Sequence, residues 1–404
     1  MTKYTNTHLH IFTANYAPDY YLKVAMPNSL GFLAPIVKTA LESGGGQFLI
    51  SRLLHVANFL TPHKRAVLER YLEFVKIGTT ENQLKLFEDL RKCYGAMFPV
   101  RYVPLTLNMD HMDIDKTSSH ANINAQLLDV ERLVAIYPNE LLPLVSVDPR
   151  HNVPDLLAWL QQYLRPDGAF YGIKIYPSKG FFPFDPRLDK VYAWAEENEI
   201  PIMTHCTRSG SFYVGKFEHQ VFPNPPSLNP QSPSMQKIYE RIQATINDKK
   251  VHSDNSKWCN IYTHPEHYLP VLEKYPNLKL CFAHLGGSTE VMNTPATAEP
   301  LYLGPNWYEL IKGLLADTRF PNLYADISYT LSKIEALEKI KQDLRNHDRV
   351  LFGTDYYMTE QEETHETDLI DNFFKVYDKA GVEKFAVINP ENYLRSKLKP
   401  NLPS

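Results

Sequence analysis

Short runs of apolar residues recur along the chain and alternate with stretches whose apolar residues are spaced three or four apart. The runs are rich in Val, Ile, Tyr and Phe, and their middles are almost continuously apolar. Parallel strands that are buried on both faces have this pattern. We therefore predict eight strands, at Thr7–Thr13, Val100–Leu107, Leu142–Val147, Phe170–Tyr176, Ile200–His205, Leu278–His284, Leu323–Ser328 and Val350–Thr354.

The stretches between these strands have the spacing of amphipathic helices. The clearest are Asn122–Tyr137, Val153–Leu164, Asp189–Asn198, Pro265–Tyr275, Trp307–Asp317 and Ser332–Asn346. A strand followed by a helix, repeated eight times, is typical of an α/β fold of the (β/α)8 or TIM-barrel type, which reaches roughly 400 residues as one unit. We therefore expect residues 1–404 to form a single barrel domain.

Two connections are much longer than a barrel requires, and both follow a predicted strand. They cover about residues 25–99, after the first strand, and about residues 209–260, after the fifth. Loops that follow strands emerge at the C-terminal face of a barrel, where the active sites of this fold lie. We expect both insertions to form lids or walls of such a site rather than separate domains.

Composition narrows the class of protein. Apolar residues make up 44% of the chain, enough for a large core, and 42 basic against 46 acidic residues leave a net charge of −4. This near balance argues against a nucleic-acid or anionic-membrane partner. The start MTKYTNTHLHIFT has no signal-peptide pattern, no apolar run approaches the ~20 residues of a membrane span, and the four cysteines form no CxxC pair. We expect a cytoplasmic protein with reduced thiols.

Residues that bind metals or carry protons lie at or near the ends of several predicted strands. The first strand contains two histidines that are two residues apart, so both rings point to the same side. The full set is His8, His10, Lys174, His205, His284 and Asp355. Each residue alone has a structural explanation, but the ends of different strands are where barrel enzymes place their catalytic groups. Together they predict a metal or catalytic site.

These residue types suit a divalent metal. Neutral imidazole and carboxylate bind zinc well, and manganese, iron or cobalt are alternatives, so we expect zinc first. A bound metal lowers the pKa of its water towards about 7 and polarises a carbonyl. Asp355 is the candidate general base and acid beside that water, and His284 is the candidate for a second metal or for the developing oxyanion.

This arrangement resembles the ligand pattern of the amidohydrolase superfamily, and the resemblance covers nearly the whole chain. It is most similar to the amidohydrolase-related branch, which includes aminocarboxymuconate-semialdehyde decarboxylase, resorcylate decarboxylases and pyrone-dicarboxylate lactonase. The stretches that carry this similarity are His264–His267, Tyr275–Leu278, Ala283–Gly287 and Asn389–Tyr393.

The resemblance implies alternatives that stay open. In two-metal members the lysine of the fourth strand is carboxylated and bridges the ions, which would make ligands of His8, His10, Lys174, His205, His284 and Asp355. In decarboxylase-like members one ion is held by the residues equivalent to His8, His10, His205 and Asp355, and His284 is free for catalysis. Lactonase-like members work without metal. Lys174 unmodified beside a substrate carboxylate is a further alternative. The resemblance also suggests a homodimer.

Two further residues are candidates for substrate binding. Arg208, three residues after His205, offers a two-pronged partner for a substrate carboxylate, and Tyr176 points to the same side of its strand as Lys174. The sequence therefore predicts a metal-dependent hydrolase that cleaves a C–N or C–O bond of a small organic molecule. The alternative is a metal-dependent, non-oxidative decarboxylase of a small carboxylated substrate.

Overall fold

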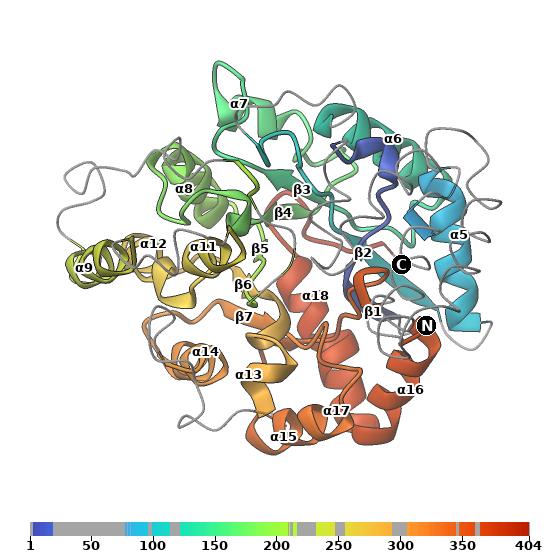
Figure 1. Cartoon of the computed structure of the whole chain (residues 1–404). Coiled ribbons are helices and arrows are strands. Elements are labelled where there is room, and N and C mark those ends of the chain that lie inside the picture. The colour runs from blue at the N-terminus through green and yellow to red at the C-terminus, as the bar shows by residue number, and fades with distance from the viewer. Residues whose placement is uncertain are drawn as a thin grey trace, which may run out of the picture.

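The computed structural model describes residues 3–18, 77–78, 80, 82–95, 99–113, 122–208, 210, 213–215, 232–246, 255–292, 305–344, 347–359 and 364–403. Within this part of the chain, strands gather at the centre of the molecule and helices lie around them (Figure 1). Each strand is followed by helices in chain order. The predicted α/β fold is therefore confirmed.

All eight predicted strands are present, although most are shorter than the apolar runs. They are β1 Tyr4–Leu9, β2 Val100–Pro104, β3 Leu144–Val147, β4 Gly172–Ile175, β5 Ile202–Thr204, β6 Leu280–Phe282, β7 Leu323–Asp326 and β8 Val350–Leu351. Every strand pair is parallel, with β1 beside β2 and with β3 to β8 in sequence order.

Backbone hydrogen bonds join these two groups of strands at two seams. At the seam between β2 and β3, the Leu142 amide donates to the Tyr102 carbonyl at 2.9 Å. At the seam between β8 and β1, the Thr7 amide donates to the Phe352 carbonyl, also at 2.9 Å. The eight strands therefore follow one another around a TIM barrel, and the carboxyl ends of all of them lie at the same face.

The helices surround this barrel. In the described ranges they include α5 Gln83–Tyr94, α6 Ile123–Ile136, α7 Leu156–Gln161, α8 Asp189–Glu197, α9 Met235–Ile246, α11 Asn255–Tyr262, α12 Leu269–Lys274, α13 Ser288–Met292, α14 Trp307–Ala316, α15 Ile334–Leu344, α16 Glu366–Val376, α17 Lys379–Glu383 and α18 Asn389–Leu394. Asn82 and Asn122 cap α5 and α6, because each side chain accepts a hydrogen bond from a first-turn amide. The helix expected over Pro265–Tyr275 is divided into a 3₁₀ turn, Pro265–Tyr268, and α12.

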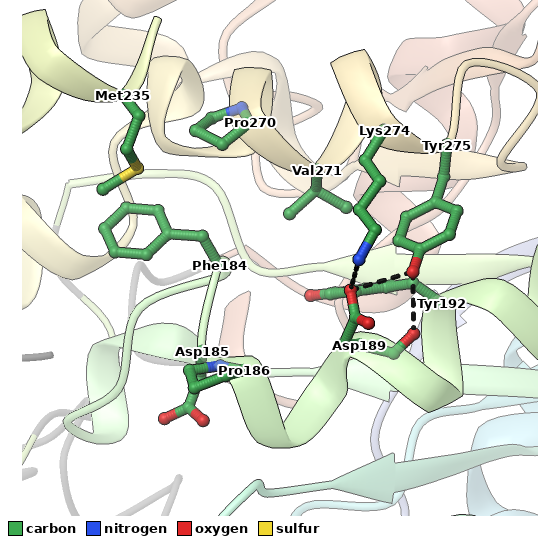
Figure 2. A pocket seen from close by; sticks show the side chains of 10 residues that line it. All are labelled: Phe184, Asp185, Pro186, Asp189, Tyr192, Met235, Pro270, Val271, Lys274 and Tyr275. Atoms are coloured by element: carbon green, nitrogen blue, oxygen red, sulfur yellow. Dashed lines mark hydrogen bonds and ion pairs between the residues drawn. The ribbon is translucent and has the colours of Figure 1, made fainter. Parts of the chain in front are cut away.

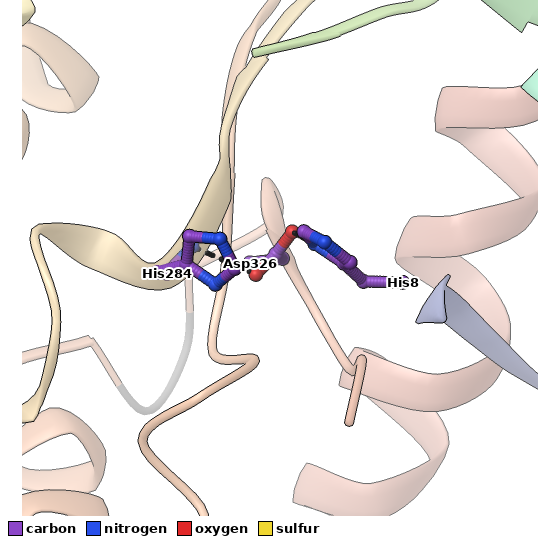
Figure 3. A group of neighbouring side chains, drawn as sticks. All are labelled: His8, His284 and Asp326. Carbon is purple, nitrogen blue, oxygen red and sulfur yellow. Dashed lines mark hydrogen bonds and ion pairs between the residues drawn. The ribbon is translucent and has the colours of Figure 1, made fainter. Parts of the chain in front are cut away.

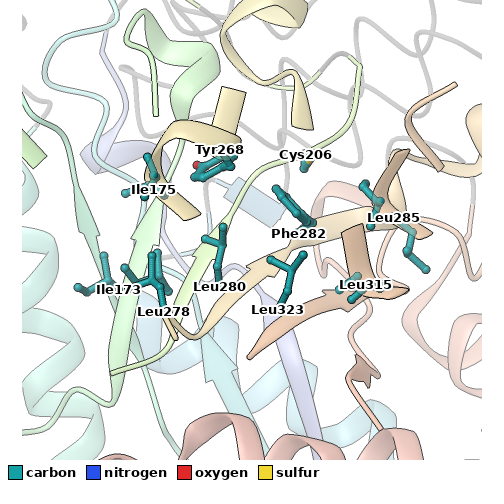
Figure 4. Close-up of a cluster of buried hydrophobic side chains, with 14 of the residues drawn as sticks. Ile173, Ile175, Cys206, Tyr268, Leu278, Leu280, Phe282, Leu285, Leu315 and Leu323 are labelled. Atoms are coloured by element: carbon teal, nitrogen blue, oxygen red, sulfur yellow. The ribbon is translucent and has the colours of Figure 1, made fainter. Parts of the chain in front are cut away.

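The buried apolar residues form three clusters, one of which packs the start of the chain against α5. The largest one lies between the strands and the surrounding helices, where side chains such as Ile173, Leu280 and Leu323 are buried (Figure 4). A second cluster includes Met203 and Cys281 of β5 and β6 together with Tyr393 of α18. Burial on both faces explains why the strands read as continuous apolar runs rather than as alternating ones.

The two predicted insertions are described only in part. Most of the first, residues 25–76, lies outside the described residues, and α5 is the main element within it. In the second, the described elements are α9 and most of α11, and the Cys259 thiol of α11 donates to the Ser178 carbonyl after β4 at 3.2 Å. This contact lies at the C-terminal face. Within the described ranges, none of the helices is long and apolar enough to cross a membrane.

Candidate metal centre

The carboxyl ends of the strands bring the predicted chemical residues to one face of the barrel. His8 lies in β1 and Lys174 in β4, while the others follow β1, β5, β6 and β8 directly or within four residues. All of them are buried, namely His8, His10, Lys174, His205, His284 and Asp355. The face of the barrel therefore holds a dry, polar cluster in which electrostatic interactions are strong.

Three atoms of this cluster converge. The Asp355 Oδ1 atom lies 3.3 Å from His8 Nε2 and 3.4 Å from His10 Nε2. The three atoms lie within 4.8 Å of one another, close enough to hold one ion. His8 Nε2 and Asp355 Oδ1 are buried and make no hydrogen bond in the part of the chain that the structure describes. A buried polar atom without a partner is costly, so this arrangement fits a bound cation.

The other nitrogen of each of these two histidines is already engaged. His8 Nδ1 lies 2.9 Å from Asp326 Oδ2, and His10 Nδ1 lies 3.0 Å from the Leu105 carbonyl. Both partners are acceptors, so each Nδ1 carries the proton and each Nε2 keeps its lone pair. Metal-binding histidines typically use this arrangement, because the acceptor fixes the tautomer and the orientation of the ring.

Asp326, at the end of β7, organises the cluster and was not singled out from the sequence. It lies between His8 and His284 (Figure 3). Its Oδ1 accepts from the His284 amide at 2.9 Å and from the Ser328 hydroxyl. His8, His284 and Asp326 form a second group of close ligand atoms. We interpret this group as a hydrogen-bonded support, because the Asp326 oxygens are already paired with protein donors.

The tautomer of His284 follows from its contact with Ser328. The Ser328 hydroxyl proton is donated to Asp326, so the hydroxyl oxygen accepts from His284 Nδ1 at 2.9 Å. His284 Nε2 then carries a lone pair and lies 3.2 Å from His205 Nδ1. The expected donation from His284 to an oxyanion does not fit this tautomer, whereas acceptance of a proton or binding of a metal does. His284 has a positive φ of 68°, an uncommon backbone conformation that often marks functional sites.

His205 contacts His284 and is not among the residues of either ligand group in the described ranges. Its ring stacks on Tyr176 with the centroids 4.1 Å apart and the planes 11° from parallel. A methyl group added at Gly210 would lie 2.7 Å from His205 Nε2 and 2.8 Å from the Tyr176 hydroxyl. The Gly210 backbone therefore closely covers both side chains, and a larger residue there would displace them.

Burial and nearby charges set the protonation states. Burial lowers the pKa of His284 to about 3, and it also lowers the pKa of His10. At Asp355, burial favours a higher pKa, but His8 and His10 outweigh it and hold the pKa well below its usual value. At His8, burial favours a lower pKa, but the Asp326 and Asp355 carboxylates outweigh burial, so the pKa is raised above its usual value. Neutral His10 and ionised Asp355 are in their metal-binding forms.

Lys174 is a buried amine whose Nζ lies over the Tyr176 ring, 5.6 Å from its centre. Its Nζ makes no hydrogen bond to any residue that the structure describes. Burial lowers the pKa of Lys174 to about 8, against the pull of Asp326 and Asp355. An unpaired cation in a barrel interior is costly, so this position calls for a modification, a ligand or a neutral amine.

Arg208 is held by an ion pair with Glu290 and by the Trp307 ring. Its Nε donates to Glu290 Oε1 at 2.6 Å, and its guanidinium lies 4.7 Å from the centre of the Trp307 ring. Both terminal nitrogens, Nη1 and Nη2, are buried and have no hydrogen-bond partner among the described residues. The ion pair and the aromatic ring therefore hold the guanidinium in place while leaving its two-pronged end unpaired.

A cavity on the flank of the barrel lies apart from this cluster. It measures about 230 Å³ and lies between α8, α12 and the start of α9, where Lys274 and Tyr275 contact Asp189 (Figure 2). None of the six chemical residues lines it. We therefore place the candidate site at the C-terminal face and not in this cavity.

Replacing Asp326 with asparagine is expected to weaken zinc binding by about 10- to 100-fold while the protein stays folded. The amide keeps the size of the side chain but provides only one acceptor in place of two, so the His8 ring loses its fixed orientation. Competition with a chromophoric chelator measures the affinity. An unchanged zinc affinity in folded D326N protein would show that Asp326 does not orient a metal-binding His8.

Comparisons with known proteins identify the family and the fold. The sequence profile described as amidohydrolase matches residues 103–395, well over half of the chain, although His8 and His10 precede the match. Among curated protein sequences, none matches.

Solved structures with a similar fold include 5-carboxyvanillate decarboxylases. The Novosphingobium aromaticivorans enzyme, in complex with manganese and 4-hydroxy-3-methoxy-5-nitrobenzoic acid, is 14% identical with a TM-score of 0.53, covering 97% of this chain and 96% of that one. The Sphingomonas paucimobilis enzyme is 10% identical with a TM-score of 0.50, covering 98% and 99%. An uncharacterised TIM-barrel protein from Bordetella bronchiseptica is 16% identical with a TM-score of 0.48, covering 97% and 98%. At these identities the likeness establishes the fold, and the profile match establishes the family. The chain is a member of the amidohydrolase superfamily.

Proposed function

We propose that this protein is a metal-dependent hydrolase that cleaves an amide, ester or lactone bond of a small organic substrate. The observation that carries the proposal is the convergence of His8 Nε2, His10 Nε2 and Asp355 Oδ1 at the C-terminal face. Three protein ligands leave room for water and substrate, as catalytic metal sites require. We expect zinc first. Manganese is the alternative, because the N. aromaticivorans decarboxylase structure contains manganese.

A divalent ion at these three atoms would lower the pKa of a coordinated water and polarise the scissile carbonyl. Asp355 then acts as the general base and acid: its carboxylate takes a proton from the attacking water and returns it to the departing nitrogen or oxygen. The lone pair of His284 Nε2, which lies 3.2 Å from His205 Nδ1, assists by accepting a hydrogen bond that orients His205 or the substrate. The buried Lys174 amine provides positive charge for an oxyanion or a substrate carboxylate.

Arg208 and Tyr176 are the proposed substrate contacts. The unpaired Nη1 and Nη2 atoms of Arg208 match the two oxygens of a carboxylate, and Glu290 and Trp307 hold the guanidinium ready for it. Tyr176 stacks its ring face on His205, and its hydroxyl lies beside Gly210. We therefore infer that the substrate carries a carboxylate in addition to the bond that is cleaved.

Replacing Arg208 with lysine is expected to raise KM for a carboxylated substrate by about 10- to 100-fold, because a charged two-pronged hydrogen bond contributes about 1.5–3 kcal/mol. Metal content should not change, since Arg208 is not one of the converging ligands. Steady-state kinetics with the acid and with its methyl ester provide the measurement. Equal KM values for the wild type and R208K with the acid would remove Arg208 from substrate binding.

Decarboxylation is the second candidate reaction, and the structural likeness to the manganese-bound 5-carboxyvanillate decarboxylase favours it; Lys174 is compatible with it. The Lys174 amine, if unmodified, makes no hydrogen bond within the described ranges and can bind the substrate carboxylate that leaves as CO₂. In that reaction the carbon–carbon bond breaks and CO₂ leaves, and the carbon that keeps the electron pair takes up a proton that enters from the solvent by way of Asp355 or His284. No water is consumed.

A substrate panel distinguishes these two reactions. Metal-depleted and zinc-loaded protein should be incubated with carboxylated amides, esters and lactones, and with aromatic and unsaturated acids that have no hydrolysable bond. Zinc-dependent hydrolysis supports the first proposal, and zinc-dependent release of CO₂ from the acids supports the second. Equal activity of the chelated and loaded protein would rule out both.

A further inference from the structure

The seam between β1 and β8 carries all three converging ligands and is held by a buried polar cluster. We call Asn6, Tyr94, Thr354 and Glu366 the seam cluster. Asn6 Oδ1 accepts from the His8 amide and from the Thr354 amide, each at 3.2 Å. This one side chain therefore ties the backbone of the strand that carries His8 to the residue immediately before Asp355.

Glu366, at the start of α16, supports Asn6 and Thr354 through hydrogen bonds. Its Oε1 accepts from the Tyr94 hydroxyl at 2.6 Å and from the Thr354 hydroxyl at 2.9 Å. The Asn6 amide group donates to those same two hydroxyl oxygens, at 2.7 and 2.8 Å. All four side chains are buried, so each bond is made in a dry environment where its loss is expensive.

The cluster brings together four distant parts of the chain: β1, α5 of the first insertion, the loop after β8, and α16. Apolar packing alone could stabilise this seam, because apolar side chains pack the strands against the helices elsewhere around the barrel. A buried carboxylate with two hydroxyl donors instead fixes distances and directions, because hydrogen bonds are directional. The residues it fixes are the immediate neighbours of His8 and Asp355.

We propose that Glu366 is a positioning residue, which acts through Asn6 and Thr354 to set the separation of His8 and Asp355 for a divalent metal. This inference rests on the proposed metal site but does not depend on which reaction the site performs. It also assigns a role to the first insertion, because the Tyr94 hydroxyl of α5 completes the set of donors to Glu366.

Two substitutions of Glu366 test the proposal by zinc affinity, measured by competition with a chromophoric chelator. E366A removes the acceptor and is expected to weaken zinc binding by about 10- to 100-fold, the usual loss when a residue that supports metal ligands is removed. E366Q keeps an acceptor oxygen at the same place and is expected to retain zinc affinity within a few-fold. The thermal midpoint of each metal-free variant is recorded in parallel.

Asp343 of α15 provides the matched control. Its Oδ2 also accepts from a tyrosine hydroxyl, that of Tyr308 at 2.9 Å in a partly buried position, but among the described residues none of its hydrogen-bond partners adjoins the three converging ligands. D343A is expected to lower the thermal midpoint and leave zinc affinity unchanged.

If E366A lowers only the thermal midpoint, as D343A does, Glu366 is merely structural and the proposal is overturned. A loss of zinc affinity in D343A equal to that in E366A would overturn it as well. Absence of zinc binding by the wild-type protein would instead contradict the proposed function itself.

Discussion

Asparagine in place of Asp355 is expected to abolish the metal site and to lower turnover by about 10²- to 10⁴-fold, the contribution typical of a general base or acid. The substitution removes the only anionic ligand among the three converging atoms and leaves a side chain that cannot accept a proton. Asparagine suits the test because residue 355 has a φ of 63°, and asparagine tolerates this left-handed conformation as aspartate does.

The measurements are the metal content of purified D355N and its activity on any substrate that the panel identifies. D343N, which alters a carboxylate of α15 instead, should retain both. A folded D355N protein with wild-type metal content would contradict the assignment of Asp355 as a ligand. A metal-loaded D355N protein with full activity would contradict its role as base.

Methionine in place of Lys174 is expected to stabilise the fold and abolish activity. Lys174 Nζ is buried without a hydrogen-bond partner in the described part of the chain, and burying such a group costs about 1–3 kcal/mol by protein mutational data. Methionine fills a similar volume without that cost. The enzyme loses the amine that we place beside the substrate, so stability and activity change in opposite directions.

Lys179 provides the control for this prediction. It is equally buried, but its amine donates to the Asn108 carbonyl, so K179M should destabilise the protein where K174M stabilises it. Thermal unfolding of the metal-free variants measures both. Loss of stability together with loss of a bound ion in K174M would indicate instead that Lys174 is carboxylated and bridges two metals.

The stabilisation by K174M should also depend on pH. Burial lowers the pKa of Lys174 to about 8, from an ordinary value of 10.5. Between these values the unfolded chain binds more protons than the folded one, so the stability contributed by this residue rises with pH. The advantage of K174M over the wild type is therefore expected to be complete below pH 8 and to shrink towards pH 10.5.

The barrel was predictable from the sequence because each strand is buried on both faces and leaves an unbroken apolar run. The ends of the strands were less predictable: β8 has the bounds Val350–Leu351, although the apolar run continues to Phe352. Burial continues beyond this run, through Tyr357, whereas the regular pairing of β8 with β7 ends at the pair of Asp326 and Leu351. The alternation of side chains along β1 correctly placed the His8 and His10 rings on the same side.

The supporting residues of the site were missed, for two different reasons. Asp326 is a charged residue inside an apolar strand, the same signal that drew attention to Lys174, so it could have been found. Glu366 and Tyr94 lie in ordinary amphipathic helices, and only the packing of segments far apart in sequence brings them to Asn6. His284 was expected either to bind a second metal or to stabilise an oxyanion, and the contact with Ser328, which favours the first of these, has no signature in the sequence.

The central claim is that His8, His10 and Asp355 hold a catalytic divalent ion, and elemental analysis of the purified protein tests it most directly. The wild type, prepared without chelators, is expected to contain about one divalent ion per chain, and the double variant H8A/H10A is expected to contain almost none while remaining folded. Equal metal content in the two proteins, or an unaltered activity in a metal-free wild type, would contradict the account.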